Sequence, residues 1–390
     1  MKGKTVQIQT KILHSIPDKI GNLKMDVLVF FLSLFRNTPH PLPSKILKRY
    51  HDNYNRYIDF LLDNELIIKV KEYGADIKRS RIYQLNPTLI SDLTTYTIKD
   101  KPLLKKINKG YTVRGFEYLT QYFNDNLTID PLPKDLQNYR NNQIQIEITN
   151  KEYFFSHNPD TDSRLHTTLT KSAKVIRPFI KYDGDNLVMI DIVSSQPYFL
   201  AVVINALLSK DEEVLQTYGI SKKITLEETT DSRLFIEKVL DGTLYDFELD
   251  IQYEDEKPFR ILNNKFSKSA KYLPQKEKVY YKSERHLKKA VVMESLFSNI
   301  KSTNKEVVIF RRQYPNVFKL KNNLDFYKTL SRMESKFILS IVGKTISKKY
   351  PIFTIHDALL CKRSDSEQIK QEFINILSDT NKIIPKLLVK

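Results

Sequence analysis

Residues 186–192 read Asn-Leu-Val-Met-Ile-Asp-Ile, and five of these seven residues are apolar. The run follows an Asp-Gly-Asp turn at 183–185, so it predicts a buried β-strand with Asp191 near its end. A carboxylate on a buried strand is costly unless it is paired or bound to a metal ion. The alternative is a structural role, in which Asp191 caps the helix that starts near Pro197.

A second stretch of the same kind lies at 350–361, Tyr-Pro-Ile-Phe-Thr-Ile-His-Asp-Ala-Leu-Leu-Cys. The apolar run Ile352–Ile355 leads into His356 and Asp357, and apolar residues then resume, which predicts a hairpin with a charged tip. Two strand-borne aspartates can hold two Mg²⁺ ions ~3.5–4 Å apart, the arrangement used for phosphoryl transfer, and Mn²⁺ suits the same ligands. The alternative is an unrelated turn.

The third stretch is a helix predicted over 282–299, which contains neither Pro nor Gly. Every fourth residue of one face is chemically distinctive: Arg285, Lys289, Met293 and Phe297. Two cations suit phosphates, and an aromatic ring suits a base or a sugar. Residues 257–289 hold eleven Lys and Arg against two acidic residues, which favours a polyanion but is also usual for a solvated face.

Composition restricts the class of protein further. The chain has 390 residues, with 63 Lys and Arg against 46 Asp and Glu, a formal net charge of +17. This balance favours nucleic acid as the partner. No apolar run approaches the ~20 residues of a membrane span, and the first ten residues contain no signal-peptide core. One cysteine excludes an internal disulfide framework and a Cys-rich zinc site, so we expect a reduced, cytoplasmic setting.

Residues 20–90 predict a compact unit of three helices, at 22–35, 45–51 and 53–64, followed by strands at 66–73 and 80–85. This order is typical of a winged helix, which binds DNA through a helix and a basic hairpin. The alternative is a small packing or protein-interaction domain. The basic residues of the predicted hairpin are Lys78, Arg79 and Arg81.

The order of these motifs carries a resemblance. Arg-Leu-His-Thr at 164–167 and Ile-Arg-Pro-Phe at 176–179 precede the Asp191 strand and its Ser-Ser-Gln-Pro-Tyr continuation, and the helix and the His-Asp hairpin follow. Over residues 160–365, this order resembles the polymerase core shared by family A DNA polymerases and single-subunit, phage-type RNA polymerases. The resemblance implies an α+β right-hand fold: a palm with an antiparallel sheet, helical fingers and a helical thumb.

The implied domains are a winged-helix-like, DNA-binding domain at 1–95, a connector or thumb-like helical region at 96–160, and palm and fingers at 161–390, with the fingers at about 205–300. The chain leaves no room for a proofreading nuclease. A mobile-element or phage replication context fits such a compact enzyme. The partners would be a primed DNA template and nucleoside triphosphates, without a membrane, and the sequence sets no oligomeric state.

The resemblance also assigns roles by position. Asp191 and Asp357 would hold the two Mg²⁺ ions, and Lys289 would protonate the leaving pyrophosphate. Nucleotide binding would use the motif residues of the helix and of the first strand's continuation: Arg285, Lys289, Met293, Phe297, Ser195, Gln196 and Tyr198. Primer and template binding would use cationic residues elsewhere: Arg164, Arg177, His356, Arg332, Lys78, Arg79 and Arg81.

Several departures from the family pattern leave the sugar choice open. The family's DNA polymerases place a Glu that excludes the 2′-hydroxyl where Tyr198 stands here, and the four-residue offset from Asp191 to Ser195 resembles the RNA polymerases. Phe297 lacks the hydroxyl of the RNA enzymes' Tyr, which favours DNA. The sequence therefore predicts a DNA polymerase. The alternatives are a primase or RNA polymerase and, from another class, a non-catalytic replication initiator that binds DNA.

Overall fold

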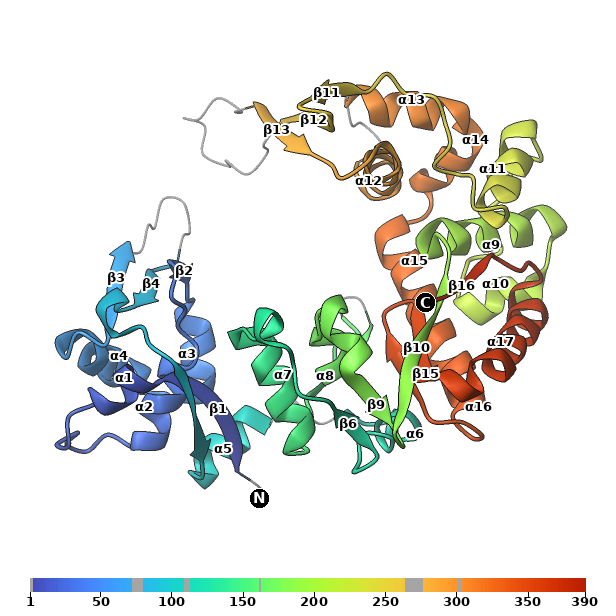
Figure 1. Cartoon of the computed structure of the whole chain (residues 1–390). Helices are drawn as coiled ribbons and strands as arrows, with labels where there is room; N and C mark the ends of the chain where they lie inside the picture. The colour runs from blue at the N-terminus through green and yellow to red at the C-terminus, as the bar shows by residue number, and fades with distance from the viewer. Residues whose placement is uncertain (1–2, 72–79, 109–112, 161–162, 264–275, 300–303) are drawn as a thin grey trace.

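The computed structural model describes residues 3–71, 80–108, 113–160, 163–263, 276–299 and 304–390. These residues form a mixed helix and sheet protein in which each paired strand runs antiparallel to its partner. The N-terminal unit lies at one end, and the elements from α9 onward lie at the other (Figure 1). Within the described residues, no helix is both long and apolar enough to cross a membrane.

The N-terminal unit contains the predicted three helices and two strands, at nearly the predicted bounds. Its core includes all but the first two residues of α2, because Val27–Leu32 are buried from every side. A three-stranded sheet in the order β2-β4-β3 covers the helices. Arg81 is exposed just before β4, whereas Lys78 and Arg79 lie outside the described residues. The elements are β1 (Lys4–Gln9), α1 (Thr10–His14), α2 (Met25–Leu32), β2 (His40–Pro41), α3 (Ser44–Tyr50), α4 (Tyr54–Asp63), β3 (Ile67–Lys71) and β4 (Ile82–Leu85).

The predicted boundary at residue 95 is wrong. Strand β5 (Leu93–Ile98) crosses it and pairs with β1, and α5 (Lys101–Asn108) continues the same unit. Leu103, Leu104 and Ile107 of α5 belong to the N-terminal core. The apolar face of α5 is therefore buried against the N-terminal unit, which extends to about residue 108.

The predicted connector at 96–160 is not purely helical. After α5 it alternates helices with strands, and β6 forms the edge of the central sheet through its pairing with β9. Glu152 binds the backbone nitrogen of Thr5 at 2.7 Å, so this region also anchors the first strand. The elements of this region are α6 (Glu117–Thr120), β6 (Leu127–Ile129), α7 (Tyr139–Thr149) and β7 (Phe155–His157). Beyond residue 160 follow β8 (Leu165–Thr167), α8 (Thr168–Lys171) and β9 (Ile180–Tyr182).

The central sheet contains both predicted aspartate strands. Its order is β14-β15-β10-β9-β6, and β16 also pairs with β10. The register places Asp191 of β10 opposite Ala358, the residue that follows Asp357. Side chains alternate along β10, so that Val188, Ile190 and Ile192 are buried in the main core and Asp191 lies on the other face. The strands are β10 (Asp185–Ile192), β14 (Ile352–Ile355), β15 (Ala358–Lys362) and β16 (Leu387–Val389).

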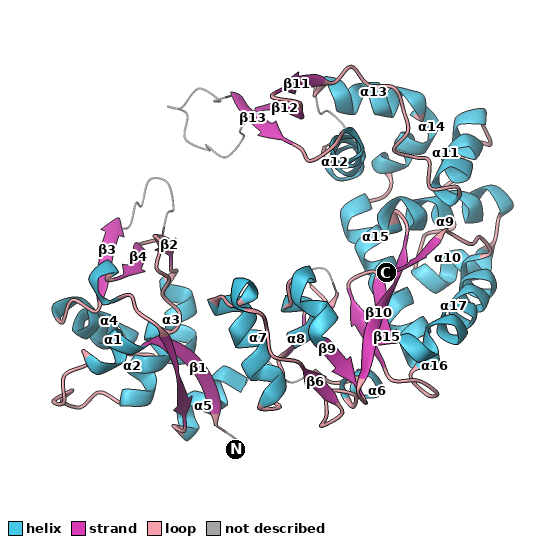
Figure 2. Cartoon of the chain, in the orientation of Figure 1, coloured by secondary structure: helices cyan, strands magenta, loops and turns pink. Residues whose placement is uncertain are grey.

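Helices α9, α15 and α17 pack against the buried face of β10 in the central sheet. A small sheet projects beyond α12 (Figure 2). The predicted fingers are therefore not wholly helical, because β11, β12 and β13 form a three-stranded sheet within them. The predicted helix at 282–299 is present as α12. The elements are α9 (Ser195–Ser209), α10 (Glu212–Tyr218), α11 (Thr230–Leu240), β11 (Gln252–Glu254), β12 (Lys257–Asn263), β13 (Lys276–Tyr280), α12 (Glu284–Phe297), α13 (Lys305–Gln313), α14 (Pro315–Lys319), α15 (Phe326–Ser335), the π-helix Lys336–Gly343, α16 (Lys344–Ile346) and α17 (Ser366–Asn381).

The C-terminal end of α12 is fixed by two cationic side chains from outside the helix. Arg311 donates to the carbonyl oxygens of Ser295 at 2.7 Å and Ser298 at 3.0 Å. Lys321 donates to the carbonyls of Leu296 at 2.5 Å and Ser298 at 2.7 Å. Cations at a helix C-terminus pair with its unsatisfied carbonyls and its dipole, so this pair holds α12 in place.

Candidate active site

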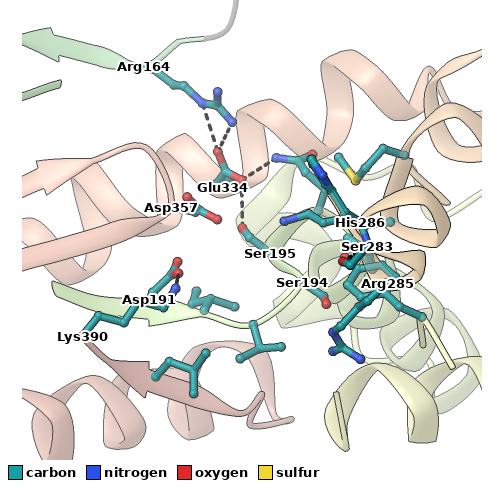
Figure 3. A pocket seen from close by; sticks show the side chains of 18 residues that line it. Arg164, Asp191, Ser194, Ser195, Ser283, Arg285, His286, Glu334, Asp357 and Lys390 are labelled. Carbon is teal, nitrogen blue, oxygen red and sulfur yellow. Dashed lines mark hydrogen bonds and ion pairs between the residues drawn. The ribbon is translucent and has the colours of Figure 1, made fainter. Parts of the chain in front are cut away.

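A pocket of about 500 Å³ lies where β10 and the β14–β15 hairpin meet α9, α12 and α15. Figure 3 shows carboxylates on one side and the first turn of α12 on another. The site is thus assembled from segments that are far apart in the chain, and its chemistry follows from the side chains that each element contributes.

Two carboxylates on adjacent strands form the acidic side. Asp191 lines the pocket from β10, and Asp357 lines it from the two-residue turn between β14 and β15. His356 begins that turn with a φ of +56°, a left-handed conformation that a side chain disfavours. The turn therefore places Asp357 beside β10. The alternative of a helix cap is excluded, because the residue at the start of α9 is Ser194 rather than Asp191.

Burial dominates the electrostatics of Asp357. Burial first, and then the charges of Glu334 and Asp191, raise the pKa of this carboxyl to about 7, and Arg164 opposes the shift. A group with such a pKa is shared between the neutral and the charged form near neutral pH. Clustered carboxylates that disfavour one another's charge attract a cation into the space between them.

Glu334 of α15 is the central polar group of the pocket. Its side chain is 1% exposed, and it accepts hydrogen bonds from Ser195 Oγ at 2.8 Å and from Gln196 Nε2. Arg164 donates to Glu334 Oε1 from Nη2 at 2.5 Å and from Nε at 3.0 Å. One buried carboxylate therefore ties β8 and the start of α9 to α15 (Figure 3).

The lysine that follows β16 reaches the acidic side. Lys390 Nζ lies 2.5 Å from Asp191 Oδ2, and both residues line the pocket. The pairing of β16 with β10 brings Lys390 there, because Leu388 stands opposite Asp191. In this structure, the ammonium group of Lys390 therefore forms an ion pair with the Asp191 carboxylate.

The basic side is the first two turns of α12. The Ser283 side chain accepts from the backbone nitrogen of His286 at 3.2 Å and so begins the helix. Arg285 is held by Asp246 at 2.8 Å and lies 5.4 Å from the ring centre of Tyr245. Lys289 follows one turn later on the same face. A helix N-terminus with Arg and Lys beside it binds phosphate groups well.

The structure brings together half of the predicted site residues. Those that line the one pocket are Asp191, Asp357, Arg164, Ser195, Gln196, Arg285, Lys289 and Met293. The sequence reasoning left out other lining residues, of which Glu334, Lys390 and Tyr245 make the contacts described above. Glu334 was left out of the predicted site because a glutamate on a helix is usually exposed or paired at the surface.

Tyr198 and Arg177 do not line the pocket, and we withdraw them from the candidate site. Tyr198 is fully buried in α9, and its hydroxyl donates to the carbonyl of Ile383 at 2.9 Å. Burial raises the pKa of this phenol. Arg177 donates to the carbonyl of Ser172 at 3.3 Å, and burial lowers its pKa. Both side chains therefore form hydrogen bonds with backbone carbonyls inside the protein rather than reaching the pocket.

Three further predicted residues lie outside the pocket lining. Phe297 packs at the end of α12, with its ring centre 5.7 Å from that of Tyr327. Arg332 is exposed on α15, whereas its neighbours Ser331 and Met333 are buried. His356 is exposed at the hairpin tip, with its ring centre 6.3 Å from that of His166. None of these three residues is among those that line the pocket.

The donor set fits a hard divalent cation. In the described part of the chain, no three His, Cys, Asp or Glu side chains cluster as a complete metal site. Of the carboxylates that line the pocket, Glu334 is engaged by Arg164, Ser195 and Gln196, which leaves Asp191 and Asp357 as the candidate cation ligands. Lys390 pairs with Asp191 in this structure. Mg²⁺ is commonly held by one or two carboxylates, with water and substrate phosphates completing the octahedron. Such binding would depend on the substrate.

Comparison with known proteins gives little beyond this geometry. No protein-family model matches the chain. No curated protein matches it significantly. Among solved structures, the POL domain of Pol1 from M. smegmatis, in complex with DNA primer-template and dNTP, matches with 12% sequence identity and a TM-score of 0.26. The match covers 64% of this chain and 50% of that one, so this chain spans half the length of its structural neighbour.

Proposed function

We propose that the protein is a template-directed nucleotidyltransferase, and most simply a DNA polymerase that extends a primer. The observation that carries this proposal is the pairing of Asp191 and Asp357 at one side of a pocket whose other side is the start of α12 with Arg285 and Lys289. Carboxylates that hold cations opposite phosphate-binding groups are what phosphoryl transfer requires.

The chain's own residues would divide the work as follows. Arg285, Lys289 and the N-terminus of α12 would bind the triphosphate, and Lys289 would neutralise the leaving pyrophosphate. Met293, one turn further along α12, would contact the sugar or base. Divalent cations held by Asp191 and Asp357 would polarise the α-phosphate and lower the pKa of the attacking 3′-hydroxyl.

Arg164 would serve the nucleic acid rather than the nucleotide. Its side chain is 27% exposed, whereas that of its partner Glu334 is 1% exposed. Glu334 therefore holds the guanidinium at the pocket wall, where it would meet the end of the primer. This placement gives Glu334 a positioning role and leaves Arg164 to make the contact.

Primer extension tests the proposal. With a primed DNA template, Mg²⁺ and dNTPs, the intact chain should lengthen the primer, and Asp357→Ala should reduce the rate about 10²–10³-fold, the loss of several kcal/mol of transition-state stabilisation. Asp379→Ala, which removes an exposed carboxylate of α17, is the matched control and should leave the rate unchanged. Equal rates for the two variants would refute a role for Asp357.

Further reactions without a primer, together with an assay of DNA binding, separate the alternatives. Products from NTPs without a primer would replace the DNA polymerase assignment with a primase or RNA polymerase. Absence of synthesis in all lanes, with DNA binding that survives the joint loss of Asp191 and Asp357, would instead favour a binding protein.

A further inference from the structure

The small sheet β11–β13 has one face that combines aromatic, apolar and cationic side chains. Its register places Phe259 opposite Tyr280 and Ile261 opposite Lys278, and directly opposite residues share a face. Tyr280 is 47% exposed and Ile261 is 45% exposed. Large apolar side chains at this exposure, side by side on one sheet, are a feature of binding surfaces.

The other face fixes the sheet to the helices behind the pocket. Arg260 is 3% exposed, and its Nη2 lies 2.9 Å from Glu294 of α12 and 3.5 Å from Glu306 of α13. Pro258, on the same face, is also buried. The sheet is therefore mounted on α12, the helix whose first turns line the pocket, and its free face points away from that helix.

Polar contacts hold the rings of the free face in fixed positions. Lys278 Nζ lies 2.7 Å from Glu254 and 5.0 Å from the ring centre of Phe259. The Tyr280 hydroxyl also donates to Glu254, and the ring centres of Phe259 and Tyr280 are 5.9 Å apart. Because these side chains are already held in place, a flat partner that stacks on them would lose little binding free energy to side-chain ordering.

We propose that this free face, formed by Phe259, Ile261, Lys278 and Tyr280, binds the unpaired template strand next to the pocket. Every base offers a flat surface to an aromatic ring, and cations nearby bind the backbone, which is how single strands are held without regard to sequence. The proposal rests on the proposed function for the identity of the strand.

Charge and chain geometry favour this occupant. The register places two cationic residues, Lys257 and Lys278, on the free face against the acidic Glu254, a positive balance that suits a polyanion. Tyr280 precedes Ser283, which lines the pocket, by three residues, a reach of at most about 11 Å of extended chain. One strand can therefore contact both the free face and the pocket.

Fluorescence anisotropy on the full chain tests this inference without catalysis. The probes are a labelled DNA hairpin with a single-stranded 5′ overhang of about ten bases and the same hairpin with a blunt end, both without Mg²⁺ and nucleotides. Tyr280→Ser should weaken binding of the overhang probe at least about fivefold, the lower end of the loss seen when base stacking is removed, and leave the blunt probe unaffected.

Tyr253→Ser is the matched control. Tyr253 is 49% exposed on β11 of the same sheet, but it belongs to the anchored face, and its hydroxyl bonds Glu284 of α12. This variant should bind both probes like the unaltered chain. Since both tyrosines are about half exposed, neither substitution should unfold the protein, which circular dichroism checks.

Three results would overturn the inference: equal losses for the two tyrosine variants, no advantage of the overhang probe over the blunt probe, or sedimentation showing self-association that Tyr280→Ser abolishes. The last would make the face an interface between copies. The binding experiment does not depend on synthesis. If the overhang effect holds while primer extension fails, the single-strand site stands and the polymerase assignment falls.

Discussion

At the scale of single residues, the pocket brings together carboxylates whose negative charges repel one another. Asp357 has its pKa raised to about 7 by burial and by the negative charges of Glu334 and Asp191. Lys390 relieves Asp191 through its contact at 2.5 Å. The residues that would bind cations during a reaction therefore cost stability when no cation is present.

This cost predicts a pH dependence of stability. The pKa of Asp357 is higher in the folded chain than the ordinary value of 3.8, so between about pH 4 and pH 7 the folded state holds a proton that the unfolded state has lost. The free energy of unfolding should therefore fall as the pH rises through this window, by up to roughly 4 kcal/mol for about three pKa units.

Urea unfolding in EDTA at about pH 5 and about pH 7.5 measures this fall, a window that the shifted pKa of Asp357 spans. In Asp357→Asn the fall should shrink, because the titrating group is gone. Added Mg²⁺ should stabilise the unaltered chain more than the variant at the higher pH, because a ligand that binds only the folded state raises its stability. Parallel pH profiles for the two proteins would contradict the prediction.

At the scale of elements, α12 is the part of the site whose position matters most. Its N-terminal turns line the pocket, and its C-terminal carbonyls are held by Arg311 and Lys321. Burial lowers the pKa of Lys321 to about 8 and that of Arg311 below its ordinary range. A buried and a half-buried cation at one helix end indicate that tertiary contacts, rather than the helix's own sequence, fix that end.

Removing one of these cations should loosen the helix. Arg311→Met removes one of the two cationic donors to the carbonyls of Ser295 and Ser298 and leaves only Lys321, so we expect a loss of about 2–3 kcal/mol of stability and weaker nucleotide binding. Arg312→Met changes the exposed neighbour on the same helix and is the control. Urea unfolding and nucleotide titration measure the two effects. Equal stability of both variants would show that the contacts to the carbonyls are dispensable.

These elements also show how far the sequence could be read. Alternation and turn residues locate β10 and the β14–β15 hairpin correctly, because both signals are local. The same local signals cannot report which side of a helix becomes covered. Tyr198 was expected in the pocket but lies in the core, and Glu334 was missed although it lies at the centre. Their positions depend on the packing of α9 against α15, which no single segment encodes.

At the scale of the whole molecule, the chain carries a formal net charge of +17, to which basic residues of the N-terminal unit contribute. In that unit α3 exposes Lys45, Lys48 and Arg49, whereas α4 exposes Asp59 and Asp63. If the unit binds DNA as a winged helix would, the charge distribution favours contact through α3 over contact through α4.

Salt dependence measures that contact. Replacing Lys48 and Arg49 by Gln should lower the steepness of log K against log salt for duplex DNA by up to about 1.8, since each released phosphate contact contributes about 0.9. Lys222→Gln with Lys223→Gln, an exposed basic pair after α10, is the control and should leave the slope intact. An unchanged slope in the α3 variant would assign DNA binding to the rest of the molecule.

The position of β10 in the central sheet has a consequence for how the protein is made. Over Leu187–Ile192, its partners are β15 and β16, which the ribosome adds only after residue 357. At 5–20 residues per second, β10 therefore waits about 10–40 s with open edges before the sheet can close around it. A chain interrupted anywhere in that interval carries an unpaired apolar strand, so such nascent chains should be frequent clients of chaperones.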